Sequence, residues 1–211
     1  MARGRFITLE GGEGAGKSTL AEGLATALEP HVGPVELTRE PGGTPNAEAV
    51  RALLLEGETG RWSPVSETLL LYAARADHAE RRIRPALDVG RWVICDRFSD
   101  STRAYQGAAG GMDAGRIAAI DAAVMEGLVP DLTLILDLDP EAGLQRALDR
   151  GEGATRFERH GLDFHRALRQ GFLDIARDEP VRCAVIDSSQ PPETVLAAAL
   201  AVIDARLGAG R

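Results

Sequence analysis

A glycine-rich segment near the start of the chain has the composition and spacing of a phosphate-binding loop. It consists of eight consecutive residues: Gly11, Gly12, Glu13, Gly14, Ala15, Gly16, Lys17 and Ser18. Glycines let backbone N–H groups turn toward phosphate oxygens, and the N-terminus of a following helix adds positive potential. Lysine at this spacing reaches the β- and γ-phosphates, and the serine hydroxyl can bind Mg²⁺. The segment therefore predicts a P-loop that binds a nucleoside triphosphate.

The distribution of positive charge supports this interpretation. Of the 24 basic residues, 23 are arginine, and Lys17 is the single lysine. A glycine-rich turn with an incidental lysine is the alternative, and the placement of the lone lysine argues against it. A signalling GTPase needs a second lysine to recognise its base, and the Leu-Ser-Gly-Gly-Gln signature of transporter ATPases does not occur in this sequence. Small-molecule kinases remain as the main class.

Two arginines follow apolar runs at positions where a second ligand could bind. Arg39 lies in the segment 38–44, and Arg97 lies in the segment 94–107. Ligands of open parallel sheets bind outside the carboxyl ends of the strands, so both segments should face the P-loop. A guanidinium can hold a phosphate through two parallel hydrogen bonds. We expect Arg39 and Arg97 to hold the phosphate of an acceptor, rather than to be solvated surface charges.

The elements that must position these residues alternate along the chain. Five apolar runs are predicted to be strands, at residues 6–9, 35–38, 92–95, 132–137 and 184–187. Stretches with helical periodicity lie at residues 18–29, 46–56, 66–89, 114–126, 141–150, 162–177 and 193–207. Apolar strands that alternate with helices predict an α/β fold with a five-stranded parallel sheet, flanked by helices on both faces. The glycine-rich stretch 107–115 and the arginine-rich stretch 150–159 are predicted to be loops.

Length, charge and cysteine content set further limits. A chain of 211 residues fits one domain, which we expect to span residues 1–211. The net charge of −8 argues against a general nucleic-acid binder. No apolar stretch reaches the roughly 18 residues of a membrane span. Cys95 and Cys183 lie in apolar runs without metal-ligand spacing, so buried, reduced thiols in a cytoplasmic protein are expected.

Four stretches together resemble the bacterial branch of the thymidylate kinases. They are the P-loop with its flanks at 10–19, the Arg-Glu-Pro-Gly-Gly at 39–43, the segment 96–107 with Asp-Arg and Ser-Thr-x-Ala-Tyr-Gln-Gly, and the Pro-Asp-Leu-Thr at 130–133. The resemblance covers about residues 6 to 195, nearly the whole chain. It implies the P-loop kinase fold, with thymidine monophosphate (dTMP) as the acceptor and ATP as the donor.

The resemblance also implies roles for individual residues toward dTMP. Arg39 and Arg97 bind the phosphate, Arg75 donates to a thymine carbonyl, and Gln106 lines the base pocket. Glu13 accepts from the sugar 3′-hydroxyl, and Tyr105 crowds the 2′ position and so favours deoxyribose. The complete implied dTMP set is Glu13, Arg39, Leu71, Arg75, Arg97, Ser101, Tyr105 and Gln106.

On the donor side, the resemblance implies an ATP site made of the eight P-loop residues, Thr19 and Arg146, with Arg146 stacked on adenine. Ser18 and Asp96 serve the Mg²⁺ ion, Asp96 through water. Residues 143–159 resemble a lid, from which an arginine closes over ATP. Arg150 and Arg156 are the candidates, which makes the expected catalytic set Lys17, Arg97, Arg150 and Arg156.

The sequence departs from the family's pattern at several positions. The segment 151–156 is one residue longer, with Thr155 where the family often has Asp, and Gly110 stands where an arginine is frequent. The family's base-stacking phenylalanine is replaced by Leu71. Successive residues on a helix point about 100° apart, so we expect Leu71 to line the pocket and Tyr72 to pack elsewhere.

These observations predict a homodimeric, Mg²⁺-dependent kinase that converts ATP and dTMP to ADP and dTDP, with the homodimer implied by the resemblance alone. Two alternatives stay open from the sequence. One is a P-loop kinase for another (deoxy)nucleoside monophosphate. The other is a non-catalytic ATP-binding regulator, against which the intact set of Lys17, Ser18, Asp96 and Arg97 argues.

Overall fold

The centre of the molecule is a five-stranded sheet in which every neighbouring pair of strands is parallel. The computed structural model describes residues 3–149 and 156–208. The strand order is β2-β3-β1-β4-β5. The strands are β1 (Phe6–Gly11), β2 (Val35–Arg39), β3 (Trp92–Asp96), β4 (Leu132–Asp137) and β5 (Cys183–Asp187). This is the predicted α/β architecture.

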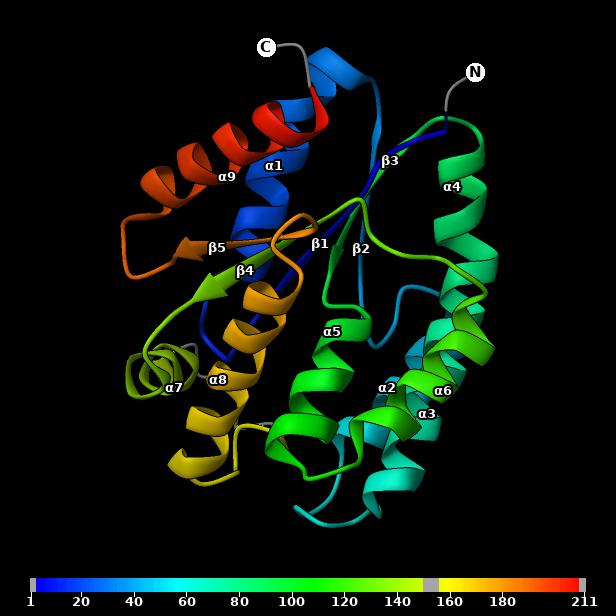
Figure 1. Ribbon diagram of the computed structural model, residues 1–211, viewed down its shortest axis with the longest axis vertical. Helices are drawn as coiled ribbons and strands as arrows, with labels where there is room; N and C mark the ends of the chain where they lie inside the picture. Colours follow the sequence, from blue (N-terminus) through cyan, green and yellow to red (C-terminus); the bar gives the residue numbers. More distant parts are fainter. Residues whose placement is uncertain (1–2, 150–155, 209–211) are drawn as a thin grey trace.

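Helices cover both faces of the sheet (Figure 1). Helices α1 and α9 pack on one face, while α4, α5 and α8 pack on the other. The helices are α1 (Lys17–Val32), α2 (Pro45–Leu55), α3 (Pro64–His78), α4 (Arg84–Asp88), α5 (Ser99–Thr102), α6 (Ala114–Met125), α7 (Pro140–Asp149), α8 (Leu162–Asp178) and α9 (Pro192–Leu207), with π-helical turns η1 (Ala79–Ile83) and η2 (Arg103–Ala109).

Burial explains why the sheet forms where the sequence predicts it. Every residue of β1 is buried, and all but the last residue of β4 are buried, because helices cover both sides of these central strands. One core cluster joins β1, β4 and β5 to α1 and α9, and a second joins β1 and β3 to α3, α4 and α6. Burial of this much apolar area is the main force that holds the layers together.

Two predicted boundaries need correction. The helix predicted at 66–89 is one helical segment, but η1 interrupts it between α3 and α4. The loop predicted at 107–115 is helical as far as Ala109, because η2 extends into it. A Cβ atom on Gly171 of α8 would lie 2.6 Å from the Cβ of Ala108, so α8 approaches η2 closely and packs against it. Of the loop predicted at 150–159, residues 156–159 form turns and the rest lies outside the described residues.

The register of the strands sets the place of the chemistry. Arg39 at the end of β2 is paired with Asp96 at the end of β3, and Leu9 of β1 is paired with the same residue. The segments that follow these three strands therefore emerge at one edge of the sheet. In the part of the chain that the structure describes, no helix is both long and apolar enough to cross a membrane.

Candidate active site

The loop between β1 and α1 has a backbone that only glycine adopts easily. Gly11, Gly14 and Gly16 have φ angles of 138°, 65° and 84°. A side chain on Gly14 would place its Cβ 2.0 Å from the carbonyl oxygen of Gly143 in α7. No side chain caps the N-terminus of α1, so its first N–H groups are available to an anion. The loop thus has the features of a phosphate site and lies directly against α7.

The amino group of Lys17 lies inside this loop. It donates to the carbonyl oxygen of Gly12 at 2.8 Å and to that of Gly11 at 3.3 Å. The side chain is buried. Burial, followed by the nearby Arg97 guanidinium, lowers the pKa of Lys17 to about 8. The ammonium is thus held ready beside the space where the loop would hold phosphates.

Ser18 and Asp96 bring two oxygen ligands together at the start of α1. The Ser18 hydroxyl donates to Asp96 Oδ2 at 2.7 Å. Mg²⁺ prefers such hard oxygen donors and usually keeps several waters and substrate oxygens. Among the described residues, no group of three or more His, Cys, Asp or Glu side chains could hold a metal by itself. The donor set fits a magnesium ion that is bound together with a nucleotide.

A cleft of about 600 Å³ opens at this edge of the sheet. It is lined by most of the residues that the sequence singled out: Glu13, Gly14, Ala15, Gly16, Lys17, Ser18, Thr19, Arg39, Leu71, Arg75, Asp96, Arg97, Ser101, Tyr105 and Gln106. The predicted donor and acceptor sites therefore share one continuous space.

Arg97 connects the P-loop to the acceptor side of this cleft. Its backbone has a φ of 72°, a left-handed conformation that is uncommon for a residue with a side chain. The backbone N–H of Arg97 donates to the Leu9 oxygen at 2.9 Å. The guanidinium donates to the Gly11 carbonyl oxygen at 2.9 Å, to Ser101 Oγ at 3.3 Å and to Glu13 Oε1 at 3.2 Å. These contacts hold the guanidinium in one orientation.

Glu10, the residue before the P-loop, is a buried carboxyl group that holds the segment directly after Arg97. It accepts from the backbone N–H groups of Phe98 at 2.7 Å and Ser101 at 3.2 Å, and from Ser101 Oγ at 2.6 Å. Burial, followed by the charge of Asp100, raises the pKa of Glu10 to about 7, against 4.5 for an exposed glutamate.

This raised pKa predicts a pH-dependent stability. Between about pH 4.5 and pH 7 the unfolded chain loses the Glu10 proton while the folded chain keeps it, so stability falls as pH rises through this window. Relative to a Glu10→Gln variant, the wild type should lose on the order of 3 kcal/mol over the window. Urea unfolding of both proteins from pH 4.5 to pH 8 measures the difference. A difference that stays constant with pH would contradict the expectation.

Glu13 and Tyr105 form a second charged contact in the cleft. The Tyr105 hydroxyl donates to Glu13 Oε1 at 2.5 Å, and the Arg97 guanidinium lies 5.0 Å from the centre of the Tyr105 ring. Burial alone would raise the pKa of Glu13, but the charges of Arg97 and Lys17 and the Tyr105 hydroxyl bring it down to about 2. Glu13 is therefore an ionised acceptor at neutral pH.

Arg75 is buried, and its guanidinium is fixed by three acceptors. Nε donates to Glu40 Oε2 at 2.6 Å, and Nη2 donates to the Phe98 carbonyl oxygen at 3.2 Å and to Thr102 Oγ1 at 3.1 Å. The other oxygen of Glu40 lies 3.0 Å from Nδ1 of His78. Arg75 Nη1 is buried and has no hydrogen-bond partner among the described residues.

Gln106, like Arg75, is buried and belongs to the lining of the cleft. Its Nε2 donates to Glu67 Oε1 at 2.8 Å, whereas its Oε1 is buried without a partner in the described part of the chain. Glu67 also accepts from Nη2 of Arg156, whose Nε donates to the Leu54 carbonyl oxygen at 2.9 Å. Two residues that line the cleft thus each carry a buried polar atom that is unpaired among the described residues, a donor on Arg75 and an acceptor on Gln106.

Leu71 and Tyr72 point in different directions from α3. Leu71 lines the cleft. Tyr72 is buried in the core cluster with β1 and β3, and its hydroxyl donates to Asp121 at 2.9 Å. This is the helix register that the sequence predicts, with Leu71 rather than Tyr72 in the cleft lining.

The comparisons with known proteins agree on one family. A family model described as thymidylate kinase matches residues 9–199. A thymidylate kinase of Caulobacter vibrioides is 58% identical over 208 residues, which is 99% of this chain and 100% of that protein. A thymidylate kinase of Bradyrhizobium diazoefficiens is 52% identical, over 92% of this chain and 86% of that protein.

The chain belongs to the thymidylate kinase family. A solved structure supports the assignment, because the crystal structure of thymidylate kinase from Ehrlichia chaffeensis superimposes with a TM-score of 0.79. That protein is 35% identical, and the match covers 95% of this chain and 99% of the other. The fold of the family and the fold described above are the same.

Within this thymidylate kinase fold, the expected lid residues have different positions. Arg146 of α7 donates to the Ser188 carbonyl oxygen at 3.1 Å, in the loop after β5. Arg150 lies outside the described residues. Arg156 is buried against Leu54 and Glu67, because Glu67 offers its guanidinium a carboxylate partner. Its expected position over the ATP phosphates would require this ion pair to separate, and its catalytic role stays a prediction.

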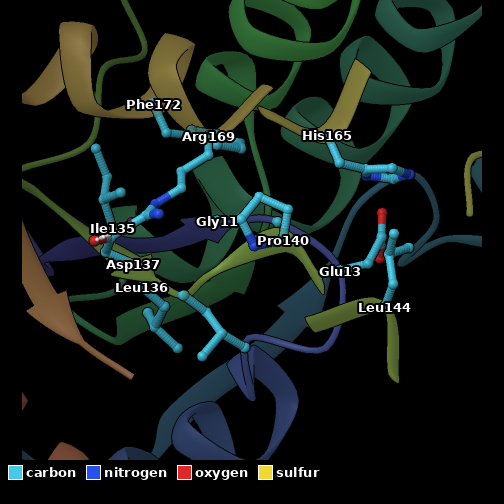
Figure 2. Close-up of a pocket in the computed structure, with 12 residues that line it drawn as sticks. Gly11, Glu13, Ile135, Leu136, Asp137, Pro140, Leu144, His165, Arg169 and Phe172 are labelled. Atoms are coloured by element: carbon cyan, nitrogen blue, oxygen red, sulfur yellow. Dashed lines mark hydrogen bonds and ion pairs between the residues drawn. The ribbon is translucent and has the colours of Figure 1, made fainter. Parts of the chain in front are cut away.

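A smaller cavity lies behind the P-loop of this kinase fold (Figure 2). Gly11, Gly12 and Glu13 line it on one side, and residues of β4, α7 and α8 enclose it. Arg169 of α8 reaches the carboxylate of Asp137 at 2.6 Å, and the Glu13 carboxylate points toward the ring of His165. This cavity therefore lies between the P-loop and the helices α7 and α8.

Sequence reasoning missed three charged residues of the site. Arg51 lines the cleft and donates to the Pro41 carbonyl oxygen at 2.7 Å. Glu40 and Glu67 hold Arg75 and Gln106 in place. The one available signal was proximity, because Glu40 lies within the Arg-Glu-Pro-Gly-Gly segment. Arg51 and Glu67 lie on helices where a charge usually indicates a solvated face.

Proposed function

We infer that this enzyme transfers the γ-phosphoryl group of ATP to dTMP and forms ADP and dTDP. The observation that carries this inference is a pair of unpartnered buried polar atoms on residues that line the cleft beside the P-loop. Arg75 Nη1 is a donor and Gln106 Oε1 is an acceptor. A buried polar group without a partner is costly, and a bound ligand can supply the missing partner.

The two atoms match the edge of a thymine ring. Thymine offers the O4 carbonyl as an acceptor, which suits the guanidinium of Arg75. Its N3–H is a donor, which suits the carbonyl oxygen of Gln106. Cytosine presents an amino group and an unprotonated nitrogen at the same positions, so both contacts would be mismatched. Leu71 supplies an apolar surface beside the base.

Three arginines are available for the phosphate of dTMP. Arg97 is held beside the P-loop, and Arg39 at the end of β2 is half-exposed and paired with Glu48 at 3.1 Å. The positive charges of Arg39 and Arg97 both act on Arg51: burial lowers the pKa of Arg51 most, and these two charges lower it further. We assign Arg39 and Arg97 to the phosphate, with Arg51 as an additional positive charge.

The sugar should lie between Glu13 and Ser101. The ionised Glu13 can accept from the 3′-hydroxyl, and Tyr105 leaves little room at the 2′ position. Ser101 is held by Glu10 and Arg97, so its hydroxyl is fixed at the acceptor side. This arrangement favours a deoxyribose.

On the donor side, Ser18 and Asp96 would hold Mg²⁺, Asp96 through water. The ion would neutralise charge on the ATP phosphates. The P-loop and Thr19 hold the triphosphate, and Arg146 lies against the adenine. Of the two lid candidates, we assign Arg150 to complete the charge around the transferring group, because Glu67 holds Arg156 in place. A cytoplasmic homodimer is part of this proposal.

Measurement of ADP release across a panel of monophosphates tests this function. We expect dTMP to have the highest kcat/KM, because it satisfies both base contacts. The dUMP value should be lower by about 10 to 200-fold, since it lacks one methyl group. The dCMP value should be lower still, because a site built around hydrogen bonds rejects a mismatched partner more strongly than a missing methyl. Higher kcat/KM for dUMP, dCMP or dGMP than for dTMP would overturn the assignment.

A further inference from the structure

The orientation of the Gln106 amide decides whether its oxygen or its nitrogen faces the base. A glutamine side chain presents an acceptor on one side and two N–H donors on the other, and the two orientations have nearly the same shape. In the described structure the nitrogen faces Glu67 at 2.8 Å, and the oxygen is the unpartnered atom. A neighbouring group must fix this orientation of the amide, because rotation of the amide would place its N–H donors where the oxygen acceptor now lies.

Glu67 is able to fix the orientation of the Gln106 amide. An ionised carboxylate only accepts hydrogen bonds, so the amide oxygen of Gln106 cannot turn toward it without repulsion. Glu67 Oε1 is bonded to Gln106 and Glu67 Oε2 to Arg156, so each carboxylate oxygen has a partner.

The surroundings make this arrangement rigid. Gln106 and Arg156 are almost completely buried, and Glu67 is largely buried. The Arg156 guanidinium is also bonded to the Leu54 carbonyl oxygen and lies 4.6 Å from the centre of the Phe157 ring. Low exposure strengthens each of these electrostatic contacts and excludes water that could replace them.

We propose that Glu67, supported by Arg156, is a specificity-determining positioning residue that fixes the amide oxygen of Gln106 toward the base. It selects a base with an N–H donor at that position, as in thymine and uracil, over one with an acceptor there, as in cytosine. Glu67 acts through Gln106 and does not itself contact the base. The proposal rests on the proposed function, and it adds the element that sets its pyrimidine selectivity.

A Glu67→Gln variant tests this. Glutamine at position 67 can offer an N–H group to Gln106, so the Gln106 amide can rotate and present its nitrogen to the base. The ratio of kcat/KM for dTMP to that for dCMP should fall by about tenfold or more, with the change mainly in the two KM values. A Glu36→Gln variant is the matched control, because Glu36 also pairs with two arginines, Arg82 and Arg91, and lies on β2 outside the cleft lining.

A double-mutant cycle separates this role from a merely structural one. In a Gln106→Ala background there is no amide to orient, so Glu67→Gln should leave the dTMP/dCMP ratio unchanged. If Glu67→Gln fails to fold, Glu67→Asp replaces it, because the shorter carboxylate withdraws from the amide. Melting temperatures of all variants identify that case.

The possible outcomes distinguish failure of the Glu67 proposal from failure of the proposed function. If the wild-type enzyme does not prefer dTMP to dCMP, the proposed function fails. If the wild type prefers dTMP and Glu67→Gln keeps the wild-type ratio, the inference fails and the function stands. A drop in the ratio of the same size in the Gln106→Ala background, or in the Glu36→Gln control, would also overturn the inference.

Discussion

Replacement of Lys17 by alanine should lower kcat by about 10²–10³ while the protein remains folded. The amino group is held by two P-loop carbonyl oxygens. In the proposed reaction it would lie where charge develops on the transferring phosphoryl group. Its pKa of about 8 means that most molecules carry the ammonium at pH 7, so the wild type retains the charge. Coupled ADP release at saturating ATP and dTMP measures the loss.

Thermal unfolding of the same variant provides the control. The amine contributes little to stability, because its burial removes a charge from water and the contacts it gains offset that cost only in part. The melting temperature should therefore not fall below the wild-type value. A melting temperature that collapses, with full activity in the remaining folded fraction, would show that Lys17 is structural.

An Arg97→Lys substitution should lower kcat/KM for dTMP by about 10² or more, although it keeps the positive charge. The guanidinium makes three oriented hydrogen bonds from two nitrogen atoms, and a single ammonium cannot reproduce that fork. Since Arg97 lies between the P-loop and the acceptor side, both KM for dTMP and kcat should change.

Arg103→Lys is the matched comparison for this prediction. Arg103 also pairs with two carboxylates, those of Asp100 and Glu179, and it lies six residues further along the chain, outside the cleft lining. Its lysine variant should keep kcat/KM within a few-fold of the wild type. Equal losses in the two variants would show that the effect of Arg97→Lys is a general loss of folding.

The fold could be predicted because its strands are short apolar runs that are buried on both faces. β4 occupies the predicted bounds, and the other strands differ by one or two residues at their ends. The π-helical turns could not be predicted, because they depend on contacts from distant parts of the chain. The turn at Arg103–Ala109 packs against α8, where Gly171 permits the close approach.

In the candidate site, too, the features set by local sequence could be predicted, and those set by distant contacts could not. The P-loop was predictable because local backbone geometry and one lysine define it. Glu40 and Glu67 were not, because each is a charged residue whose burial depends on an arginine 35 or 89 residues away. Arg156 illustrates the limit of a family resemblance: the resemblance implied a lid position, but an acidic partner on α3 determines where the side chain lies in this structure.

The burial of Lys17 has a consequence for the covalent chemistry of the protein in the cell. Acetylation, ubiquitination and methylation of lysine all use its side-chain amine, and this sequence of 211 residues offers one such amine. That amine is enclosed by the carbonyl oxygens of its own nucleotide loop. Modification of this lysine and binding of ATP should therefore exclude each other. The fraction of chains with a modified lysine would then equal the fraction of inactive enzyme.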